Sequence, residues 1–392
     1  MEKIPITVIG GGVVGLSIVN VLLDRGYKDI LLLEKNEAFG REQSDRNSGV
    51  IHCGVYYNPG SLMAKLCVEG NPLLYNFAEK HGVPNQRTGK LIVATNEEED
   101  KILDTFLQRG MENAVPGINK LTKKEVSNIE PNVRAISALH CPTTGIISSA
   151  DYVKTLEKVI ASKHNEKAYL MKNQNVIGIE PKSGYSTVHV RTTKGKTEEW
   201  EFDTDMLINS AGLFAVDIAK MVNLNTPYEK AYLRGEYNKF YSTRRSELDI
   251  KSNIYPTPRT FILKDGVEFF DFGIHLTPTF ETSRDGKHVI GREVWVGPKF
   301  EDTNNPADRR TGIVETEKFY DQVKTFFPGI RKEDLQLSDS GVLGILNKPW
   351  DFVIYKEENH PNCIQLLGME SPALTASQAI ANYVADLMKP QL

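Results

Sequence analysis

The chain has 392 residues, a net charge of −4 and a hydrophobic content of 40%. Its length suits two domains, and its composition excludes a disordered or fibrous protein. The small negative charge argues against nucleic acid as a partner, and no apolar run in the sequence is long enough to cross a membrane.

The cysteines show neither a C-x-x-C pair nor the spacing of a metal site: Cys53, Cys67, Cys141 and Cys363. We therefore expect reduced thiols and no metal. The first predicted strand begins by Ile4 or Pro5, which leaves no room for a signal or transit peptide. A cytoplasmic location is the simplest expectation.

The N-terminal segment has the pattern of a dinucleotide-binding turn: a short apolar strand, a glycine turn and a helix to about Arg25. Gly10, Gly12 and Gly15 follow the spacing G-x-G-x-x-G. Gly10 makes the tight turn, Gly12 lets a pyrophosphate approach the backbone, and Gly15 lets the helix pack close to the sheet. The free N–H groups at the start of the helix then face the phosphates.

An acidic residue follows the next predicted strand, as this motif requires. Asp29–Leu33 reads as the second strand and Glu34 closes it. A carboxylate there accepts hydrogen bonds from both hydroxyls of an adenosine ribose. The motif alone leaves NAD and FAD open.

The remaining elements follow from apolar periodicity and from residues that begin or end helices. A polar, glycine-containing loop spans residues 39–54. We expect helices over Leu62–His81, Glu97–Glu112, Lys123–Ile129, Phe214–Val222, Thr316–Phe327 and Ala373–Leu387, and a further helix that is capped by Ser149 or Asp151 and runs to about Ala161. We expect strands over Gly89–Ala94, Tyr169–Glu180, Ser186–Thr193, Thr197–Phe202, Met206–Ile208, Leu335–Leu346, Asp351–Tyr355 and Cys363–Leu367, with a largely antiparallel set between Tyr232 and about Thr282.

These elements predict an α/β protein in which a Rossmann-like FAD-binding domain is interleaved with a substrate domain on a mixed or antiparallel sheet. The FAD-binding domain is expected to comprise residues 1–48, 141–225 and 335–392, and the substrate domain residues 49–140 and 226–334. The return of the C-terminus to the nucleotide domain favours FAD over NAD. The last helix, which starts at Pro372, is then expected to aim its first N–H groups at the flavin ring.

Short motifs along nearly the whole chain resemble the L-2-hydroxyglutarate oxidase/dehydrogenase family of D-amino-acid-oxidase-like flavoproteins. They are Asn47–His52, Tyr56–Leu62, Lys65–Cys67, Gly89–Ala94, Pro142–Ile146, Leu233–Tyr237, Ile254–Pro256, Gly273–Pro278 and Glu370–Ser377. The resemblance implies an FAD enzyme that oxidises a 2-hydroxy acid to the 2-oxo acid by hydride transfer to flavin N5. The family's best-known substrate is L-2-hydroxyglutarate, and its eukaryotic members are typically mitochondrial. The electron acceptor, oxygen or a quinone, stays open.

Two departures from the family pattern concern the substrate. The family usually places an arginine after Ala/Ser-Gly-Val, whereas Ser340–Val342 is followed here by Leu343 and Gly344. The family's Gly-Pro-Asn-Ala is replaced by Gly291–Val294. If the absent arginine binds a substrate carboxylate, the substrate preference has shifted, and Arg292 is one substitute charge.

Oxidation of a hydroxy acid requires a cation for the carboxylate and a base for the hydroxyl proton. We expect Arg234 to be the cation, with a structural ion pair to Glu236 or a neighbour as the alternative. His275 is the first candidate for the base, against a satisfied core histidine. His52 is the second candidate, and it is also placed to orient the flavin or carry a covalent link to it. Tyr255, with Tyr56 and Tyr57, is expected to hydrogen-bond substrate oxygens, and Lys90 either lies near the flavin or extends outward.

The residues expected to contact FAD come from the first turn, the loop after Lys35, a second glycine turn and the start of the last helix. They are Gly10, Gly12, Val14, Gly15, Glu34, Lys35, Ser44, Arg46, Asn47, Ser48, Gly49, Val176, Ala211, Gly212, Gly341, Gly368, Glu370, Ser371, Leu374 and Thr375. Hydroxyls, amides and exposed N–H groups in the loop suit pyrophosphate and ring oxygens, and the Val176 backbone is expected to face adenine.

Two alternatives remain at this point. The first is an amino-acid oxidase of the same superfamily, because a neutral amine needs no strong base. The second is a protein that binds FAD without turnover, which the missing arginine keeps open.

Overall fold

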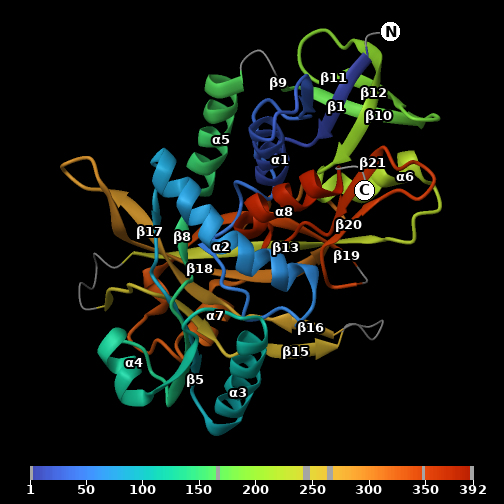
Figure 1. Cartoon of the computed structure of the whole chain (residues 1–392). Coiled ribbons are helices and arrows are strands. Elements are labelled where there is room, and N and C mark those ends of the chain that lie inside the picture. Colours follow the sequence, from blue (N-terminus) through green and yellow to red (C-terminus); the bar gives the residue numbers. More distant parts are fainter. Residues whose placement is uncertain (1–2, 165–167, 242–247, 263–267, 347–348, 389–392) are drawn as a thin grey trace.

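The computed structural model describes residues 3–164, 168–241, 248–262, 268–346 and 349–388 (Figure 1). Two eight-stranded sheets organise the fold, and together with the helices they confirm the predicted α/β class. The described α-helices are α1 (Val13–Asp24), α2 (Leu62–His81), α3 (Glu97–Glu112), α4 (Lys123–Ile129), α5 (Ser149–His164), α6 (Ala215–Val222), α7 (Thr316–Val323) and α8 (Ala373–Leu387).

The first sheet, in the upper part of Figure 1, is built on parallel strands. Its strands are β1 (Lys3–Ile9), β2 (Ile30–Leu33), β9 (Ala168–Met171), β10 (Gln174–Pro181), β11 (Ser186–Thr192), β12 (Glu199–Asn209), β20 (Val353–Lys356) and β21 (Cys363–Leu367). β1 pairs in parallel with β2 and β12, and β9 and β21 extend the parallel set. Their carboxyl ends therefore share one edge, where ligands bind in such sheets.

Helices cover both faces of this sheet. The apolar side chains of α1, α5 and α8 pack with β1 and β2 in the largest core cluster, which α2 joins. The other face packs against α6. The burial of nearly all of α1 and of most of α8 reflects their high content of Val, Ile, Leu and Ala.

The second sheet, in the lower part of Figure 1, is mixed, as predicted. Its strands, in spatial order, are β19 (Leu335–Leu346), β13 (Lys230–Tyr241), β18 (His288–Thr303), β17 (His275–Thr282), β14 (Asn253–Pro256), β5 (Lys90–Ala94), β7 (Ser137–Cys141) and β6 (Asn119–Thr122). Neighbours are antiparallel except for β14 and β5. Two smaller sheets comprise β3 (Val50–Ile51), β4 (Asn85–Gln86) and β8 (Gly145–Ile147), and β15 (Arg259–Ile262) with β16 (Glu268–Asp271).

Local capping explains why several helix predictions are confirmed at both ends. Ser61 accepts a hydrogen bond from the Ala64 N–H at 3.1 Å at the start of α2, and Gly82 ends it with φ 70°. The expected bounds of α2, α3, α4 and α8 agree with the structure.

Other boundaries were wrong. The strand predicted over 169–180 is broken, because Asn173 has φ 60° between β9 and β10. The strands predicted over 197–202 and 206–208 form the single strand β12, and α7 ends at Val323. The cap of α5 is Ser148, whose Oγ accepts a hydrogen bond from the Asp151 N–H at 3.4 Å, rather than Ser149 or Asp151.

One segment lies in a different sheet from the one expected. We assigned Leu335–Leu346 to the nucleotide-binding part, but this strand, β19, pairs with β13 along most of its length. The edge strand of the second sheet therefore comes from the C-terminal part of the chain. The division into two domains stays a prediction, with this strand on the substrate side.

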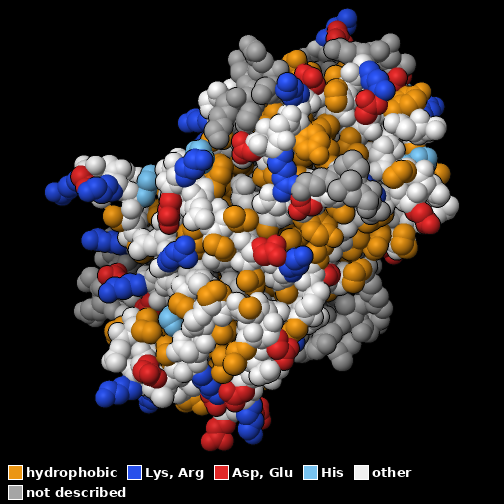
Figure 2. Space-filling model, in the orientation of Figure 1, with side chains coloured by type: hydrophobic (Ala, Val, Ile, Leu, Met, Phe, Trp, Pro, Cys, Tyr) orange, Lys and Arg blue, Asp and Glu red, His pale blue; other side chains and the backbone are white. Residues whose placement is uncertain are grey.

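The surface shown in Figure 2 carries Lys and Arg side chains interspersed with Asp and Glu side chains, outside the atoms drawn in grey. Such mixing agrees with the net charge of −4. Among the described helices, none combines the length and the apolar composition needed to span a bilayer.

Candidate active site

The glycine turn lies at the carboxyl end of β1, at the centre of the first sheet. Gly10 has φ 103°, and a Cβ there would lie 2.5 Å from the Ser210 carbonyl oxygen. A Cβ on Gly15 would lie 2.0 Å from the Gly10 carbonyl oxygen. Both positions therefore require glycine, and Gly15 acts by letting α1 pack against the turn rather than by lining the cavity.

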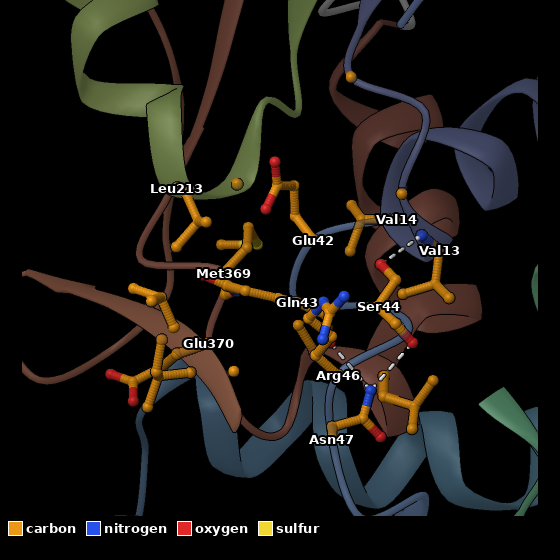
Figure 3. A pocket seen from close by; sticks show the side chains of 18 of the residues that line it. Val13, Val14, Glu42, Gln43, Ser44, Arg46, Asn47, Leu213, Met369 and Glu370 are labelled. Atoms are coloured by element: carbon orange, nitrogen blue, oxygen red, sulfur yellow. Dashed lines mark hydrogen bonds between the residues drawn. The ribbon is translucent and has the colours of Figure 1, made fainter. Parts of the chain in front are cut away.

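The first turn of α1 presents backbone N–H groups to a loop hydroxyl. The Val13 N–H donates to Ser44 Oγ at 3.1 Å, and a Cβ on Gly12 would lie 2.9 Å from the same oxygen (Figure 3). The absence of a side chain at Gly12 keeps this approach open. The start of a helix, whose first N–H groups have no partner within the helix, suits a pyrophosphate.

Glu34 ends β2 beside the start of α1. Its carboxylate accepts hydrogen bonds from the Gly11 and Asn36 N–H groups, both at 2.8 Å, and it is 7% exposed. Burial raises its pKa, and these two hydrogen bonds oppose the rise. The side chain is therefore fixed at the position where the ribose of a dinucleotide is expected.

The loop after Lys35 forms one wall of the cavity. The Asn47 amide donates to the carbonyl oxygens of Gln43 and Ser44, both at 2.9 Å, and its side-chain oxygen accepts from the Gly49 N–H at 2.8 Å. Asn47 thereby fixes the loop. Figure 3 shows Ser44, Arg46 and Asn47 on this side of the cavity.

Gln43 was not predicted, yet it connects this loop to both neighbouring walls. Its side-chain N–H donates to the Met369 carbonyl at 3.0 Å, and its side-chain oxygen accepts from the Gly344 N–H at 2.8 Å. A lone glutamine in a polar loop carries no signal of such a role. Leu213, Phe214, Met369 and Trp350 also line the cavity without having been predicted.

The cavity continues from the glycine turn to the second sheet and measures about 790 Å³. This is a volume typical of a cofactor and ligand site. At the far end its lining is aromatic and polar: His52, Tyr56, Tyr57, Tyr237, Tyr255, Phe272, His275, Trp350, Glu370 and Ser371. We call this part the histidine end.

His275, on β17, is 6% exposed, and its ring is stacked on Tyr255 with centroids 3.8 Å apart. Its Nδ1 lies 3.1 Å from the Gly273 carbonyl oxygen, and its buried Nε2 has no hydrogen-bond partner among the described residues. Burial lowers the pKa of His275 to about 3, with a further lowering from Lys90 and an opposing effect of the Gly273 carbonyl. The ring is therefore neutral at physiological pH.

His52 approaches the same space from the loop before α2. Its backbone N–H donates to Thr375 Oγ1 at 2.9 Å, and its Nε2 lies 3.2 Å from Ser371 Oγ. Burial, together with the charges of Lys90 and His275, holds its pKa well below the usual range. The two predicted histidines thus meet in one cavity, and both are neutral.

Glu370, labelled in Figure 3, supplies a carboxyl group to the histidine end of the cavity. Burial raises its pKa to about 8, and a hydrogen bond with Trp350 opposes the rise. At neutral pH the group is mostly protonated, so it adds little negative charge to the cavity.

Arg234, predicted as the carboxylate clamp, does not line the cavity, and its role as a clamp stays a prediction. Its guanidinium lies 3.8 Å from Glu236 and 3.5 Å from Asp308, all three residues being buried, and it does not line the cavity. Side chains alternate along β13, so Gly235 and Tyr237 face the cavity while Arg234 faces away. The ion pair that we held as the alternative is the arrangement observed. Arg292 is exposed and also lies outside the lining.

Most of the predicted cofactor residues line the cavity: Gly10, Gly12, Val14, Glu34, Lys35, Ser44, Arg46, Asn47, Ser48, Val176, Ala211, Gly212, Gly341, Glu370, Ser371 and Leu374. Gly15, Gly49, Gly368 and Thr375 do not. Gly49 and Gly368 have positive φ in supporting turns, and Thr375 holds the His52 backbone. The individual contacts to FAD stay predictions.

Comparison with known proteins agrees with these features. A family model described as FAD dependent oxidoreductase matches residues 5–387. The chain is 31% identical to the mitochondrial L-2-hydroxyglutarate dehydrogenase of Arabidopsis thaliana, over 98% of this chain and 83% of the relative. It is 33% identical to the L-2-hydroxyglutarate dehydrogenase of Indibacter alkaliphilus, over 97% of this chain and 98% of the relative.

Among solved structures, the chain is similar to dithionite-reduced L-alpha-glycerophosphate oxidase from Mycoplasma pneumoniae with FAD bound. The TM-score is 0.80 at 28% identity, over 99% of this chain and 95% of that one. Glycine oxidase from Geobacillus kaustophilus, at 17% identity and a TM-score of 0.76, shares the fold.

Proposed function

The chain belongs to the family of FAD-dependent oxidoreductases, and from this premise we propose that it oxidises a 2-hydroxy acid to the 2-oxo acid, with L-2-hydroxyglutarate as the first candidate substrate. Two relatives that match nearly the whole chain carry the name L-2-hydroxyglutarate dehydrogenase. The turn at Gly10, the helix start at Gly12 and the carboxylate of Glu34 fit the pyrophosphate and ribose of FAD. When bound, FAD supplies the hydride acceptor, N5 of its ring.

The observation that carries the chemistry is the tautomer of His275. A neutral imidazole whose Nδ1–H donates to the Gly273 carbonyl has its lone pair on Nε2, and this Nε2 has no partner among the described residues. His275 is therefore the proposed base that takes the hydroxyl proton. A substrate carboxylate nearby favours the imidazolium that results.

His52 has a supporting role in this proposal. Its Nε2 is occupied by the Ser371 hydroxyl at 3.2 Å, and its backbone is held by Thr375 and Asn71. These contacts fix the ring at the start of α8. Tyr255 fixes the plane of the His275 ring by stacking, and the hydrogen bond from Nδ1 to the Gly273 carbonyl fixes which edge carries Nε2.

L-alpha-glycerophosphate is the second candidate substrate. The structure similar at a TM-score of 0.80 is an oxidase of that compound, and Leu343 stands where the resemblance to 2-hydroxyglutarate enzymes places an arginine. Both compounds are secondary alcohols that carry an anionic group, so the same base serves either. Oxygen and a quinone stay the two predicted electron acceptors.

The test is anaerobic reduction of the FAD-loaded protein, followed by the loss of visible flavin absorbance. We expect L-2-hydroxyglutarate to bleach the flavin faster than L-alpha-glycerophosphate, D-2-hydroxyglutarate or amino acids. Faster bleaching by L-alpha-glycerophosphate would favour the second candidate, and bleaching by amino acids alone would refute both. If none of these compounds bleaches the flavin, the remaining interpretation is a protein that binds FAD without turnover.

The same assay tests the base. His275→Asn is expected to slow flavin reduction by about 100-fold or more while FAD stays bound. His288→Asn, a change at an exposed histidine of β18, serves as the control. If His52→Asn has the large effect and His275→Asn does not, the base is His52.

A further inference from the structure

Lys90 is a buried cation that the proposed chemistry does not yet use. It begins β5 and has 0% of its surface exposed. Its Nζ lies 4.5 Å from the ring centroid of Tyr56 and 4.4 Å from that of Tyr255. It has no hydrogen-bond partner and no carboxylate partner among the described residues. Because an unpaired buried ammonium is costly, the fold retains it at a price in stability.

The register of the second sheet places this charge directly behind the histidine end. β14 lies between β5 and β17, with Tyr255 opposite Ile92 on one side. On the other side the Tyr255 ring is stacked on His275 at an interplanar angle of 12°. Lys90 and His275 thus flank Tyr255 from neighbouring strands. Tyr56 and Tyr255 both line the cavity, so their rings separate the ammonium from it.

The described cations that do line the cavity are each paired with a carboxylate. The distances are 3.3 Å for Lys35–Glu42, 3.5 Å for Arg41–Asp45 and 3.0 Å for Arg46–Asp339. Arg234 faces away and is paired as well. Of these five described cations, Lys90 is therefore the one without a carboxylate partner, and it lies next to the histidine end.

We propose that Lys90 is a positioning residue whose ammonium, acting through the rings of Tyr56 and Tyr255, attracts the anionic group of the substrate to the histidine end. This proposal rests on the proposed oxidation of an anionic alcohol. Lys90 then supplies the positive charge that, in the family which this chain resembles, would come from an arginine at the position of Leu343. The tyrosine hydroxyls contact the anion, and the ammonium behind the rings strengthens them as donors.

The groups around Lys90 come from several elements. The thiols of Cys53, Cys67 and Cys141 and the rings of His52 and His275 all interact with its charge. Burial lowers the pKa of Lys90, and the three thiols oppose this. An arriving anion acts in the same direction as the thiols, so binding of the anion stabilises the ammonium.

The expected size of the effect follows from Coulomb's law. An anion on the cavity side of the rings lies about 8 Å from Nζ, which at an effective dielectric constant of about 20 corresponds to about thirtyfold in affinity. Because Lys90→Met removes an unpaired buried charge and keeps an apolar chain of similar length, we expect it to fold at least as stably as the wild type.

The experiment is calorimetric titration of the FAD-loaded protein with glutarate and, separately, with inorganic phosphate. We expect the anion that the wild type binds more tightly to bind about thirtyfold more weakly to Lys90→Met and Lys90→Gln. Lys90→Arg should restore most of the affinity. Lys101→Met, at an exposed lysine of α3, should bind like the wild type, and FAD affinity should be unchanged in all of them.

Equal anion affinities in wild type and Lys90→Met overturn the proposal, as does a wild type that binds neither anion. Either outcome would mean that Lys90 acts only within the core, for example as a counter-ion of Cys53. A second readout separates charge from structure: in flavin reduction, KM for the substrate should rise in Lys90→Met more than kcat falls. If L-2-hydroxyglutarate fails to reduce the flavin but anion binding still depends on Lys90, the substrate assignment fails and this proposal stands.

Discussion

Glu370 gives the most quantitative prediction, because its pKa is shifted to about 8 in the folded protein by burial. An ordinary glutamate, as in the unfolded chain, titrates near 4.5. Between these two pH values the folded protein holds a proton that the unfolded chain has lost. The free energy of unfolding therefore falls as pH rises from about 4.5 to about 8 and is then constant with respect to this group.

The size of this decrease is about 5 kcal/mol over the whole interval, at about 1.4 kcal/mol per pH unit. Glu370→Gln removes the titration while keeping the shape of the side chain and an oxygen for Trp350. We expect the urea midpoint of the wild type, at saturating FAD, to fall between pH 5 and pH 8.5. In the variant, the free energy of unfolding from the same urea titrations should fall by a few kcal/mol less over this pH range than it does in the wild type.

The control is Glu358→Gln, because Glu358 is exposed. Its urea midpoints should follow those of the wild type at both pH values. If Glu370→Gln and the wild type show the same pH dependence, the carboxyl group is not buried in a neutral state and the description of the histidine end is wrong.

Two further variants test the glycine turn and the ion pairs of Arg234 on β13. Gly15→Ala should lower FAD affinity by at least tenfold in a fluorescence titration, because the new Cβ would lie 2.0 Å from the Gly10 carbonyl oxygen; an unchanged affinity would contradict the close packing of α1. Arg234→Met should lower the free energy of unfolding by about 3 kcal/mol, because it removes the cation beside the buried carboxylate of Glu236, whereas Asp308 keeps its pairing with Arg310. A variant that keeps its urea midpoint but has a raised KM would instead restore Arg234 as the carboxylate clamp.

The part of the fold that the sequence predicted best depends on local signals. The turn at Gly10 and the acid at Glu34 form a contiguous strand–turn–helix–strand pattern, so their meeting at one sheet edge follows from that pattern. Helix α2 was predicted from its apolar periodicity and from Gly82, which ends it, and in the structure Ser61 caps its start. The loop residues Ser44 and Asn47 were predicted from their polar character, and Asn47 also belongs to one of the motifs that resemble the family.

The remaining features depend on pairings between distant segments. Whether Arg234 or Gly235 faces the cavity depends on the face that β13 turns to its neighbours, and sequence alternation alone does not decide which face that is. The pairing of β19 with β13 joins segments far apart in the chain. Lys90 looked like a lysine at a strand end, and only the arrangement of β5, β14 and β17 places it behind Tyr255.

The central claim is tested most directly by counting product against reduced flavin. The FAD-loaded protein is mixed anaerobically with one equivalent of L-2-hydroxyglutarate, and flavin absorbance and 2-oxoglutarate are measured together. The account predicts one 2-oxoglutarate for each flavin reduced. Protein that takes up FAD yet forms no 2-oxoglutarate while its flavin stays oxidised would contradict it.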